Sequence, residues 1–482
     1  MKLRYIAFSL ISGILSGLSF NFPFLSLLLW FSLVSLFFTV KNTTYRGAFL
    51  YSYLAGFVHF LVAIYWIRFV TTLGLFLLIF YLSFYWGLAG LASKRFLESK
   101  KNIIFIPFLW IILEYVRAQF GGFGWALFGY SQYRWIYLIQ SADMLGVWII
   151  SFLIVYCNLL LFNFFQLPDK RPVIKQLFVF IILFFSFIAY GFLSLKTEYS
   201  SDRALSISIV QPNVGQYKKW DASYYPEIRD TLVRLTENTP RDSLVIFPEA
   251  SWPYGLNDND FADLRVFIKE VDRDLIMGIV EEERGKFHNS SFLFLKDGSF
   301  IGKYKKVNLV PFGEFVPLRR FLGFIDVLNE FGDISPGQEL ALFSYKDIKI
   351  ATLICFEDIF PRLASRLTAR GAEILVNITN DDWFKGYPEA VQHLQIAVFR
   401  AIEQRRFLIR SANTGISCVI SPKGEIIKTL RRANKDVFIE GVLDEKVFSI
   451  NKKTIYNILP DVLVYIGLAV CIVGSVRLKG NG

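Results

Sequence analysis

The chain is poor in the residues that build metal sites and disulfide frameworks. Its 482 residues include 3 His, 4 Cys and 3 Met. The His residues stand far apart, at positions 59, 288 and 393, and the Cys spacing matches no zinc or disulfide pattern. We therefore expect no metal and no cofactor, and we interpret His393 as a hydrogen-bonded helix residue because no nucleophile is near it in sequence. We also expect no cleaved signal sequence, because the first apolar run continues into a second without a small-residue cleavage site.

Charged residues are also scarce. They make up 19% of the chain, whereas 54% is hydrophobic and 17% aromatic, with a mean hydropathy of +0.42. This composition is too apolar for an ordinary soluble protein. The net charge of +11 would suit nucleic acid. However, the basic residues cluster between apolar spans, which is typical of membrane topology, so we expect a lipid bilayer and no nucleic acid as the partner.

About eight apolar spans have the length of a transmembrane helix. Seven belong to a predicted membrane domain, residues 1–196, and the eighth to a C-terminal segment, residues 456–482. We place the spans near residues 5–20, 24–40, 48–68, 72–93, 102–118, 145–165, 177–194 and 459–476.

Basic residues occur in alternate loops. They precede span one, separate spans two from three, four from five and six from seven, and follow span eight. The positive-inside rule makes that side cytoplasmic. Both termini are then predicted inside, and residues 197–455 outside.

Residues 205–448 have a different pattern. Short β-branched runs alternate with segments of helical periodicity, which predicts an α/β domain with a sizeable core. The predicted strands are LSISIVQ, SLVIFPE, DLIMGIVEE, SSFLFL, IKIATLIC, EILVNIT, FLIRSAN, SCVIS and VFIEGVL, and the predicted helices are 222–238, 260–271, 358–370 and 388–405.

An aromatic loop follows the fifth span, with the sequence GGFGWALFGYSQYRW. It includes Trp125 and fits either an interfacial aromatic belt or part of a rim for lipid entry. Glu114 and Arg117, just before it, share one helical face. They are either a simple pair or, as ionisable residues at membrane depth, a functional feature.

Four strand ends carry reactive groups. Cys355 ends the apolar run of Lys349–Asp358 and precedes a helix, so it is either a nucleophile or a small buried hydrophobe. Glu249 follows a strand and is either a general base or a residue of a helix cap or surface turn. In KYKKVNLVPFGEFVPL, one lysine is either a solvated edge residue or a group that stabilises an oxyanion. The fourth strand end, after EILVNIT, is followed by a loop that contains Asn380, Asp381, Trp383 and Phe384.

These motifs resemble the nitrilase superfamily, whose shared pattern is Glu, Lys and Cys at strand ends. The sequence is more similar to its membrane branch, the apolipoprotein N-acyltransferases, along nearly the whole chain. The resemblance rests on the membrane bundle and on GFGWALFGYSQ, FPEASWP, KKVNLVPFGEFVPL, ICFED, NDDWF and QHLQIAVFRAIEQRRFLIRSANTG. It implies an αββα sandwich inserted between transmembrane helices.

The resemblance also implies roles for single residues. Glu249 matches the general base, Lys306 the lysine and Cys355 the nucleophile, while Glu314, Glu357 and Asn289 match supporting positions. Trp125, Trp220, Phe356 and Trp383 are the candidates for substrate or lipid contact. The chain departs from the family pattern at Asn308, where the family usually has His, and at Phe356, where it commonly has Tyr.

The implied reaction is acyl transfer from a membrane phospholipid, through a Cys355 thioester, to the α-amine of a diacylglyceryl apolipoprotein in the bacterial inner membrane. Ping-pong kinetics would follow. The apolar segment 315–331 is interpreted as a mobile lid rather than a packed helix. Two alternatives are a membrane-tethered amidase that acts on small amides, and a transporter or receptor with an inactive outer domain.

Overall fold

The computed structural model describes residues 2–98, 104–199, 201–252, 261–316 and 334–479, without the side chains of residues 220, 222 and 475–479. The chain forms two compact units. The helical unit comprises residues 1–197, 391–399 and 454–482, and the sandwich unit comprises residues 198–390 and 400–453. The predicted lid, 315–331, lies almost wholly outside the described residues.

The helical unit is built from apolar helices. Among the described residues, six segments are long and apolar enough to cross a membrane: Lys2–Asn21, Pro23–Lys41, Tyr45–Ala63, Thr72–Leu97, Trp148–Gln166 and Arg171–Lys196. They correspond to α1 (Lys2–Asn21), η1 (Pro23–Trp30) with α2 (Val34–Lys41), α3 (Tyr45–Ala63), α4 (Thr72–Leu97), α8 (Trp148–Gln166) and α9 (Arg171–Lys196). The predicted fifth and eighth spans correspond to shorter helices, α5 (Phe105–Gln119) and α17 (Val462–Lys479). A total of eight crossings therefore stays a prediction.

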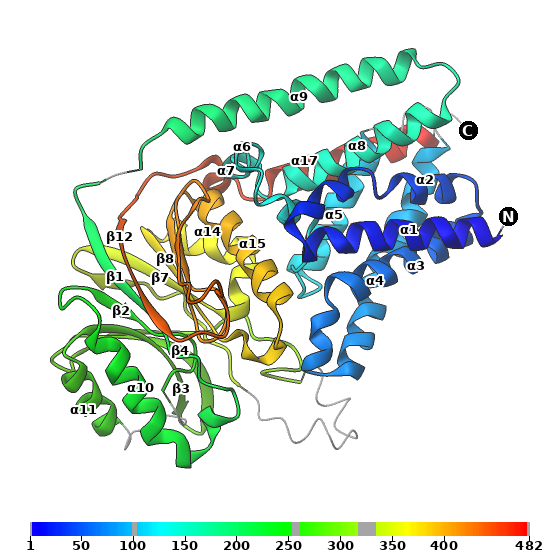
Figure 1. Ribbon diagram of the computed structural model, residues 1–482. Coiled ribbons are helices and arrows are strands. Elements are labelled where there is room, and N and C mark those ends of the chain that lie inside the picture. Colours follow the sequence, from blue (N-terminus) through cyan, green and yellow to red (C-terminus); the bar gives the residue numbers. More distant parts are fainter. Residues whose placement is uncertain (1, 99–103, 200, 253–260, 317–333, 480–482) are drawn as a thin grey trace. The chain divides into compact units, whose positions relative to one another are not determined.

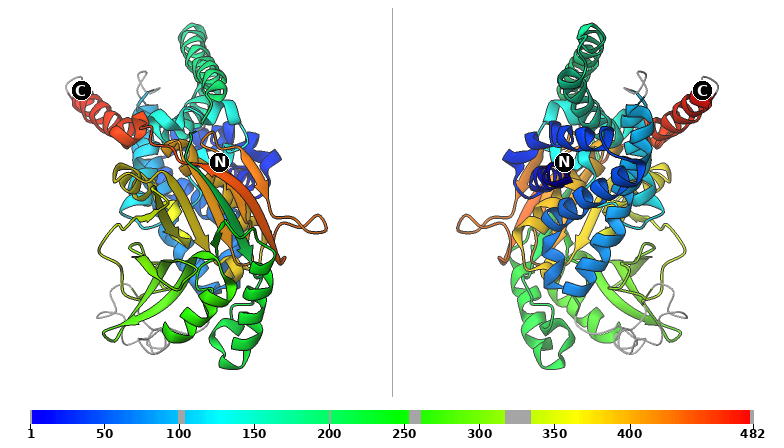
Figure 2. Two further views of the ribbon diagram at one scale, coloured as in Figure 1. Left: turned by 90° about the vertical axis from the view of Figure 1, so that its left-hand side faces the viewer. Right: turned by 90° about the vertical axis from the view of Figure 1, so that its right-hand side faces the viewer.

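Shorter elements connect these helices: η2 (Tyr65–Phe69), η3 (Phe128–Gln132), α6 (Ile136–Ile139), α7 (Ala142–Leu145) and α16 (Ile455–Ile458). Helix α9 runs along the outside of the helical unit (Figures 1 and 2), and only four of its residues are buried. Its exposed apolar side chains suit a lipid environment.

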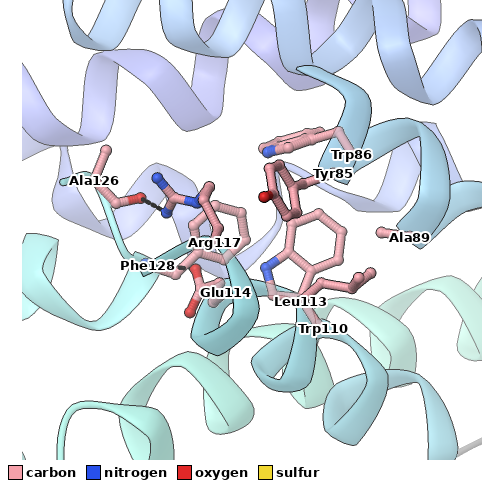
Figure 3. Close-up of a pocket in the computed structure, with 9 residues that line it drawn as sticks. All are labelled: Tyr85, Trp86, Ala89, Trp110, Leu113, Glu114, Arg117, Ala126 and Phe128. Atoms are coloured by element: carbon pink, nitrogen blue, oxygen red, sulfur yellow. Dashed lines mark hydrogen bonds between the residues drawn. The ribbon is translucent and has the colours of Figure 1, made fainter. Parts of the chain in front are cut away.

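Glu114 and Arg117 both bind the main chain of the aromatic loop. The guanidinium of Arg117 donates to the carbonyl oxygens of Phe123 (3.2 Å), Trp125 (2.6 Å) and Ala126 (3.2 Å). A carboxylate oxygen of Glu114 accepts from the N–H of Phe128 at 2.9 Å. Both side chains line a small cavity of the helical unit (Figure 3). Because the loop backbone bends away from regular structure here, these two side chains satisfy groups that would otherwise be unpaired in the bundle.

The sandwich unit contains two six-stranded sheets. The first has the order β12-β1-β2-β3-β4-β5 and the second the order β11-β10-β9-β8-β7-β6. The strands of the first are β1 (Ala204–Gln211), β2 (Leu244–Ile246), β3 (Asp274–Glu283), β4 (Lys286–Phe294), β5 (Phe300–Lys305) and β12 (Gly441–Phe448). Those of the second are β6 (Phe343–Tyr345), β7 (Ile348–Ile354), β8 (Ile374–Thr379), β9 (Phe407–Ala412), β10 (Cys418–Ile420) and β11 (Ile426–Thr429).

The centre of each sheet is parallel. β1, β2 and β3 pair in parallel in the first sheet, and β7, β8 and β9 do so in the second. Side chains join the sheets face to face: the Ser411 hydroxyl of β9 donates to the carbonyl oxygen of Ile246 of β2 at 3.0 Å. Parallel strands align their carboxyl ends, which is where α/β proteins carry their sites.

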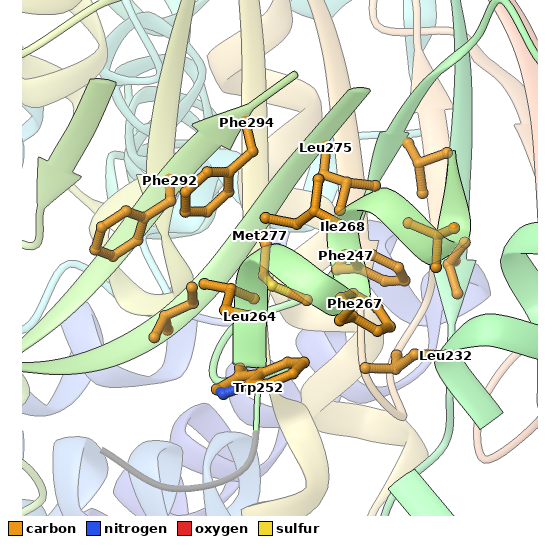
Figure 4. Close-up of a cluster of buried hydrophobic side chains, with 14 of the residues drawn as sticks. Leu232, Phe247, Trp252, Leu264, Phe267, Ile268, Leu275, Met277, Phe292 and Phe294 are labelled. Atoms are coloured by element: carbon orange, nitrogen blue, oxygen red, sulfur yellow. The ribbon is translucent and has the colours of Figure 1, made fainter. Parts of the chain in front are cut away.

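Helices cover the outer faces of the sheets. α10 (Tyr225–Glu237) and α11 (Phe261–Val271) bury a cluster of apolar side chains against the first sheet, including Phe247, Phe267, Met277 and Phe292 (Figure 4). Helix α14 (Pro361–Ala369) packs against β7 of the second sheet. The two helices on one side and α14 on the other give the predicted αββα arrangement. Three 3-10 turns, η4 (Lys218–Trp220), η5 (Ala222–Tyr224) and η7 (Asp381–Phe384), complete the elements of this region, apart from η6, described below. The helix α15 (Tyr387–Gln404) is shared, because its residues 391–399 belong to the helical unit and its two ends to the sandwich unit.

Some strand predictions were wrong in their limits. Residues 437–440 were predicted to be strand, but β12 begins at Gly441, where its antiparallel pairing with Gln211 of β1 begins. Phe438 has a φ of 53° and its N–H donates to the carbonyl oxygen of Thr414, which takes it out of extended geometry. β5, β6 and β11 were not among the predicted strands, because short edge strands have weak apolar patterns and depend on their pairing partners.

Candidate active site

Glu249, Lys306 and Cys355 each lie just beyond the end of a strand in the sandwich unit. Glu249 follows β2, Lys306 follows β5, and Cys355 follows β7 and opens the 3-10 turn η6 (Cys355–Ile359). The Nζ atom of Lys306 lies 3.5 Å from Oε1 of Glu249. The charges of both residues act on the thiol of Cys355. The strand ends therefore gather a thiol, a carboxylate and an ammonium group.

The main chain at Cys355 is strained. Its φ of 52° lies in the left-handed region, which is uncommon for a residue with a side chain. Asn377 of β8 holds this corner by donating its amide to the carbonyl oxygens of Cys355 and Leu353, both at 3.2 Å. Arg410 of β9 donates to the Asn377 amide oxygen at 2.7 Å, and both side chains are fully buried. The corner that presents the thiol is thus fixed by two neighbouring strands.

The ammonium of Lys306 sits between two carboxylates. It lies 2.9 Å from Oε2 of Glu314, and the amide of Asn289 donates to Glu314 Oε1 at 2.9 Å and to Glu249 Oε1 at 2.7 Å. The N–H of Val310 donates to Glu314 Oε2 at 2.8 Å. These charge-assisted bonds leave Lys306 and Glu249 with little rotational freedom.

The electrostatics favour a neutral thiol and a charged lysine. Burial, and then the charge of Glu249, raise the pKa of the Cys355 thiol well above its ordinary value, although Lys306 lowers it. Burial alone lowers the pKa of Lys306, but Glu314, Glu249 and Cys355 together raise it above its ordinary value. The thiol therefore needs a base to become a nucleophile, while Lys306 is a permanent positive charge.

Two family models match the chain. Residues 12–160 match the apolipoprotein N-acyltransferase N-terminal domain, and residues 206–445 match carbon-nitrogen hydrolase. The apolipoprotein N-acyltransferase of Geobacter metallireducens is 34% identical, over 97% of this chain and 93% of its own length. This chain belongs to the apolipoprotein N-acyltransferase family. The relative in Aquifex aeolicus, also named apolipoprotein N-acyltransferase, is 29% identical over 89% of this chain and 97% of its own length.

In this N-acyltransferase family member, the carboxyl group of Glu357 accepts hydrogen bonds from two segments of the site. Its Oε1 accepts from the hydroxyl of Tyr304 at 2.8 Å, from the N–H of Val307 at 2.8 Å and from the N–H of Asn308 at 3.1 Å. Its Oε2 accepts from the N–H of Ile354 at 2.8 Å. Burial raises the pKa of Glu357 to about 7, against the hydrogen bonds from Ile354, Asn308 and Tyr304 and the charge of Lys306. This carboxyl ties the Lys306 segment to the corner at Cys355.

Two positions at which the chain departs from the family pattern have simple structural surroundings. Asn308 contributes its main-chain N–H to Glu357, a bond that any residue except proline can make. Phe356 packs edge-on against Phe360 with ring centroids 5.4 Å apart. The described contacts of both positions therefore require neither His nor Tyr.

The other three candidates for lipid contact lie in separate segments of the chain. Trp125 lies in the helical unit, where its indole N–H donates to Gln392 Oε1 at 2.7 Å and its ring packs beside His393 at 5.2 Å. Trp383 lies in η7 with a side chain 47% exposed. Trp220 ends η4, and its side chain is outside the described residues.

Several residues that contact the candidate site were missed from the sequence. Arg410 and Asn377 interrupt otherwise apolar strands, a signal that could have marked them as buried polar partners. Tyr304 had no such signal, nor did Lys219, whose ammonium donates to the carbonyl oxygen of Glu249, since each stands within a polar run. Their contacts depend on segments far apart in the sequence.

Proposed function

We propose that this protein transfers an acyl chain from a membrane phospholipid to the α-amine of the S-diacylglyceryl cysteine that begins an apolipoprotein. The observation that carries the proposal is the placement of Lys306 between Glu249 and Glu314, with the charges of Lys306 and Glu249 acting on the Cys355 thiol. Membership of the apolipoprotein N-acyltransferase family supports the choice of substrates.

The first half-reaction forms a thioester. Glu249 takes the proton of the Cys355 thiol as the sulfur attacks the ester carbonyl carbon of the phospholipid. The ammonium of Lys306 stabilises the oxyanion, and one such donor is worth about 3–4 kcal/mol. When the tetrahedral intermediate collapses, the C–O bond breaks. Glu249 then returns the proton to the leaving lysophospholipid oxygen.

The second half-reaction breaks the thioester. The neutral α-amine of the lipid-modified cysteine attacks the acyl carbon, and Glu249 accepts a proton from the nitrogen. The C–S bond breaks, the amide forms, and the proton passes to the sulfur, which regenerates the Cys355 thiol. Two acceptors that act in turn on one covalent intermediate give ping-pong kinetics.

The location is part of the proposal. Both substrates carry acyl chains, so a bilayer anchor keeps the site at the surface where they lie. We place the sandwich unit on the periplasmic side of the bacterial inner membrane and both termini in the cytoplasm, because the basic loops alternate along the helical unit. Trp125, Trp220, Phe356 and Trp383 are the proposed contacts for lipid or acyl chain.

A burst experiment tests the function. The purified full chain, mixed with phospholipid alone, should release about one lysophospholipid per Cys355 and then stop, and the intact protein should gain the mass of an acyl chain. A diacylglyceryl-cysteine peptide with a free α-amine should restart turnover and yield an N-acyl amide, whereas the N-acetylated peptide should not. Steady release of fatty acid without an amine would instead indicate a hydrolase of the amidase kind.

A further inference from the structure

Lys219 is a buried lysine that the proposed reaction does not use. It lies in η4 and is 3% exposed, whereas its neighbour Lys218 is exposed and forms an ion pair with Glu227 at 2.9 Å. Lysine is rarely buried unless it is paired with a carboxylate. Among the described residues, no carboxylate forms an ion pair with Lys219, and its one hydrogen bond runs to the carbonyl oxygen of Glu249 at 3.2 Å.

The main chain at Glu249 has few other supports. The β2 ladder ends just before it, and Ala250 has a φ of 46°, in the left-handed region. Gly278 of β3 holds the residues on either side, because its N–H donates to the Pro248 carbonyl at 3.2 Å and its carbonyl accepts from the N–H of Ser251 at 2.9 Å. Lys219 is the described donor to the carbonyl of Glu249 itself.

The segment that carries Lys219 is fastened at its other end to the second sheet. The N–H of Gln216 donates to Asp382 Oδ2 at 2.6 Å, and the Gln216 side chain accepts from the amide of Asn380. The N–H of Val214 donates to Asn413 Oδ1 at 3.0 Å. Residues 214–219 therefore connect the loops after β8 and β9 to the main chain of Glu249, and the ammonium of Lys219 makes the last contact.

We propose that Lys219 is a positioning residue, whose charged ammonium fixes the main chain at Glu249 and so aims that carboxylate at the Cys355 thiol. The inference rests on the proposed function, in which Glu249 is the general base. A neutral amine would hold the carbonyl more weakly, because hydrogen bonds from a charged donor are about twice as strong as neutral ones. The alignment of the base then depends on the protonation of Lys219.

The protonation of Lys219 predicts how the rate of acyl-enzyme formation changes with pH. Burial lowers the pKa of Lys219 to about 8, against the charges of Glu249 and of Asp382 on η7. The nearest charge on its own turn, Lys218, is paired with Glu227. The pKa values of Cys355 and Lys306 are both raised above their ordinary values. The rate of acyl-enzyme formation should therefore fall as pH rises through about 8, where Lys219 loses its proton.

Three variants of the full chain test this role: Lys219→Met, Lys219→Arg and, as the matched control, Lys218→Met. The burst of lysophospholipid is timed between pH 6 and pH 10 in detergent micelles that hold phosphatidylethanolamine and phosphatidylglycerol. At pH 7, Lys219→Met should slow the burst by about 10- to 100-fold and keep its amplitude and the KM for phospholipid, since only the base is misaligned. Lys218→Met should match the wild type.

The pH profile separates positioning from a merely structural role. In Lys219→Arg the decline near pH 8 should disappear, because arginine stays protonated throughout this range. The inference is overturned if Lys219→Met keeps the burst rate within about 2-fold of the wild type. It is also overturned if Lys219→Met loses burst amplitude and thermal stability while Lys219→Arg retains the alkaline decline. A wild type without any burst, or a full burst in Glu249→Gln, would defeat the proposed function instead.

Discussion

The side-chain amide of Asn377 donates a hydrogen bond of 3.2 Å to the carbonyl oxygen of Cys355. Through this bond, a neighbouring parallel strand supports a residue whose φ of 52° is unfavourable for a side-chain-bearing amino acid. The side-chain oxygen of Asn377 in turn accepts a hydrogen bond from Arg410 of β9, so the support extends to a third strand. The thiol is held in place by the interior of the second sheet as well as by its own chain neighbours.

Removal of this support should slow thioester formation. Asn377→Ala leaves the Cys355 carbonyl and the Arg410 donor without their partner, and an unmet buried polar group costs about 1–3 kcal/mol. We expect the burst of lysophospholipid to slow by about 10-fold and the melting temperature to fall. The control is Asn238→Ala, because that amide donates to the Arg234 carbonyl at an exposed helix end. Equal effects of both variants would refute a specific role for Asn377.

Cys355→Ala should abolish both half-reactions, since no thioester can form. The measurement is the mass of the intact protein after incubation with phospholipid, together with the yield of N-acylated peptide. Cys157→Ala, Cys418→Ala and Cys471→Ala should keep most activity, because Cys418 is fully buried in β10 and the other two belong to the apolar helices α8 and α17. Acyl transfer by Cys355→Ala would show that the nucleophile is assigned to the wrong residue.

Gly278→Ala should displace the general base. A Cβ atom at this position would meet the Cα atom of Glu249 at 2.6 Å and the nitrogen of Ala250 at 2.8 Å, and these backbone atoms cannot move aside cheaply. A shift of about 1 Å in a catalytic group can cost about 100-fold in rate. Gly302→Ala, on β5 of the same sheet, is the control, because its Cβ atom would have only ordinary contact with Phe343 at 3.7 Å. The burst rate of Gly278→Ala should fall far below that of Gly302→Ala.

The stability of the protein should depend on the protonation of Glu357. The pKa of this carboxyl is about 7 in the folded protein, against an ordinary value of 4.5. The folded state therefore binds a proton more tightly than the unfolded state, and stability should fall as pH rises from about 4.5 to 7, by at most about 3 kcal/mol. Melting temperatures of the wild type and Glu357→Gln between pH 5 and pH 8 measure this. As pH rises, the melting temperature of the wild type should fall relative to that of Glu357→Gln. A difference between the two melting temperatures that stays constant with pH would contradict the prediction.

The topology can be tested with reporter fusions. Fusions after residues 45, 98 and 172 should report the cytoplasm, and fusions within residues 201–252 should report the periplasm, because the basic loops of the helical unit alternate. A cytoplasmic signal from the sandwich unit would overturn the proposed location and, with it, access to exported apolipoproteins.

Much of this protein follows from its sequence. Long apolar runs predict helices for a bilayer, and short β-branched runs predict buried strands, because each pattern satisfies the backbone in only one kind of structure. Glu249 and Cys355 stand where such runs end, and the family resemblance singled out Lys306 among its neighbouring lysines, so the residues of the candidate site could be named before their geometry was known.

The tertiary structure decided which groups meet. Nothing in the sequence indicates that Asn289 bridges Glu249 and Glu314, or that Lys219 reaches the carbonyl of Glu249, because these bonds join segments brought together only by the sheets. The start of β12 likewise depends on its pairing with β1. Local patterns fix the elements through backbone hydrogen bonding and burial. The charges around the thiol depend on distances between those elements, and packing alone sets those distances.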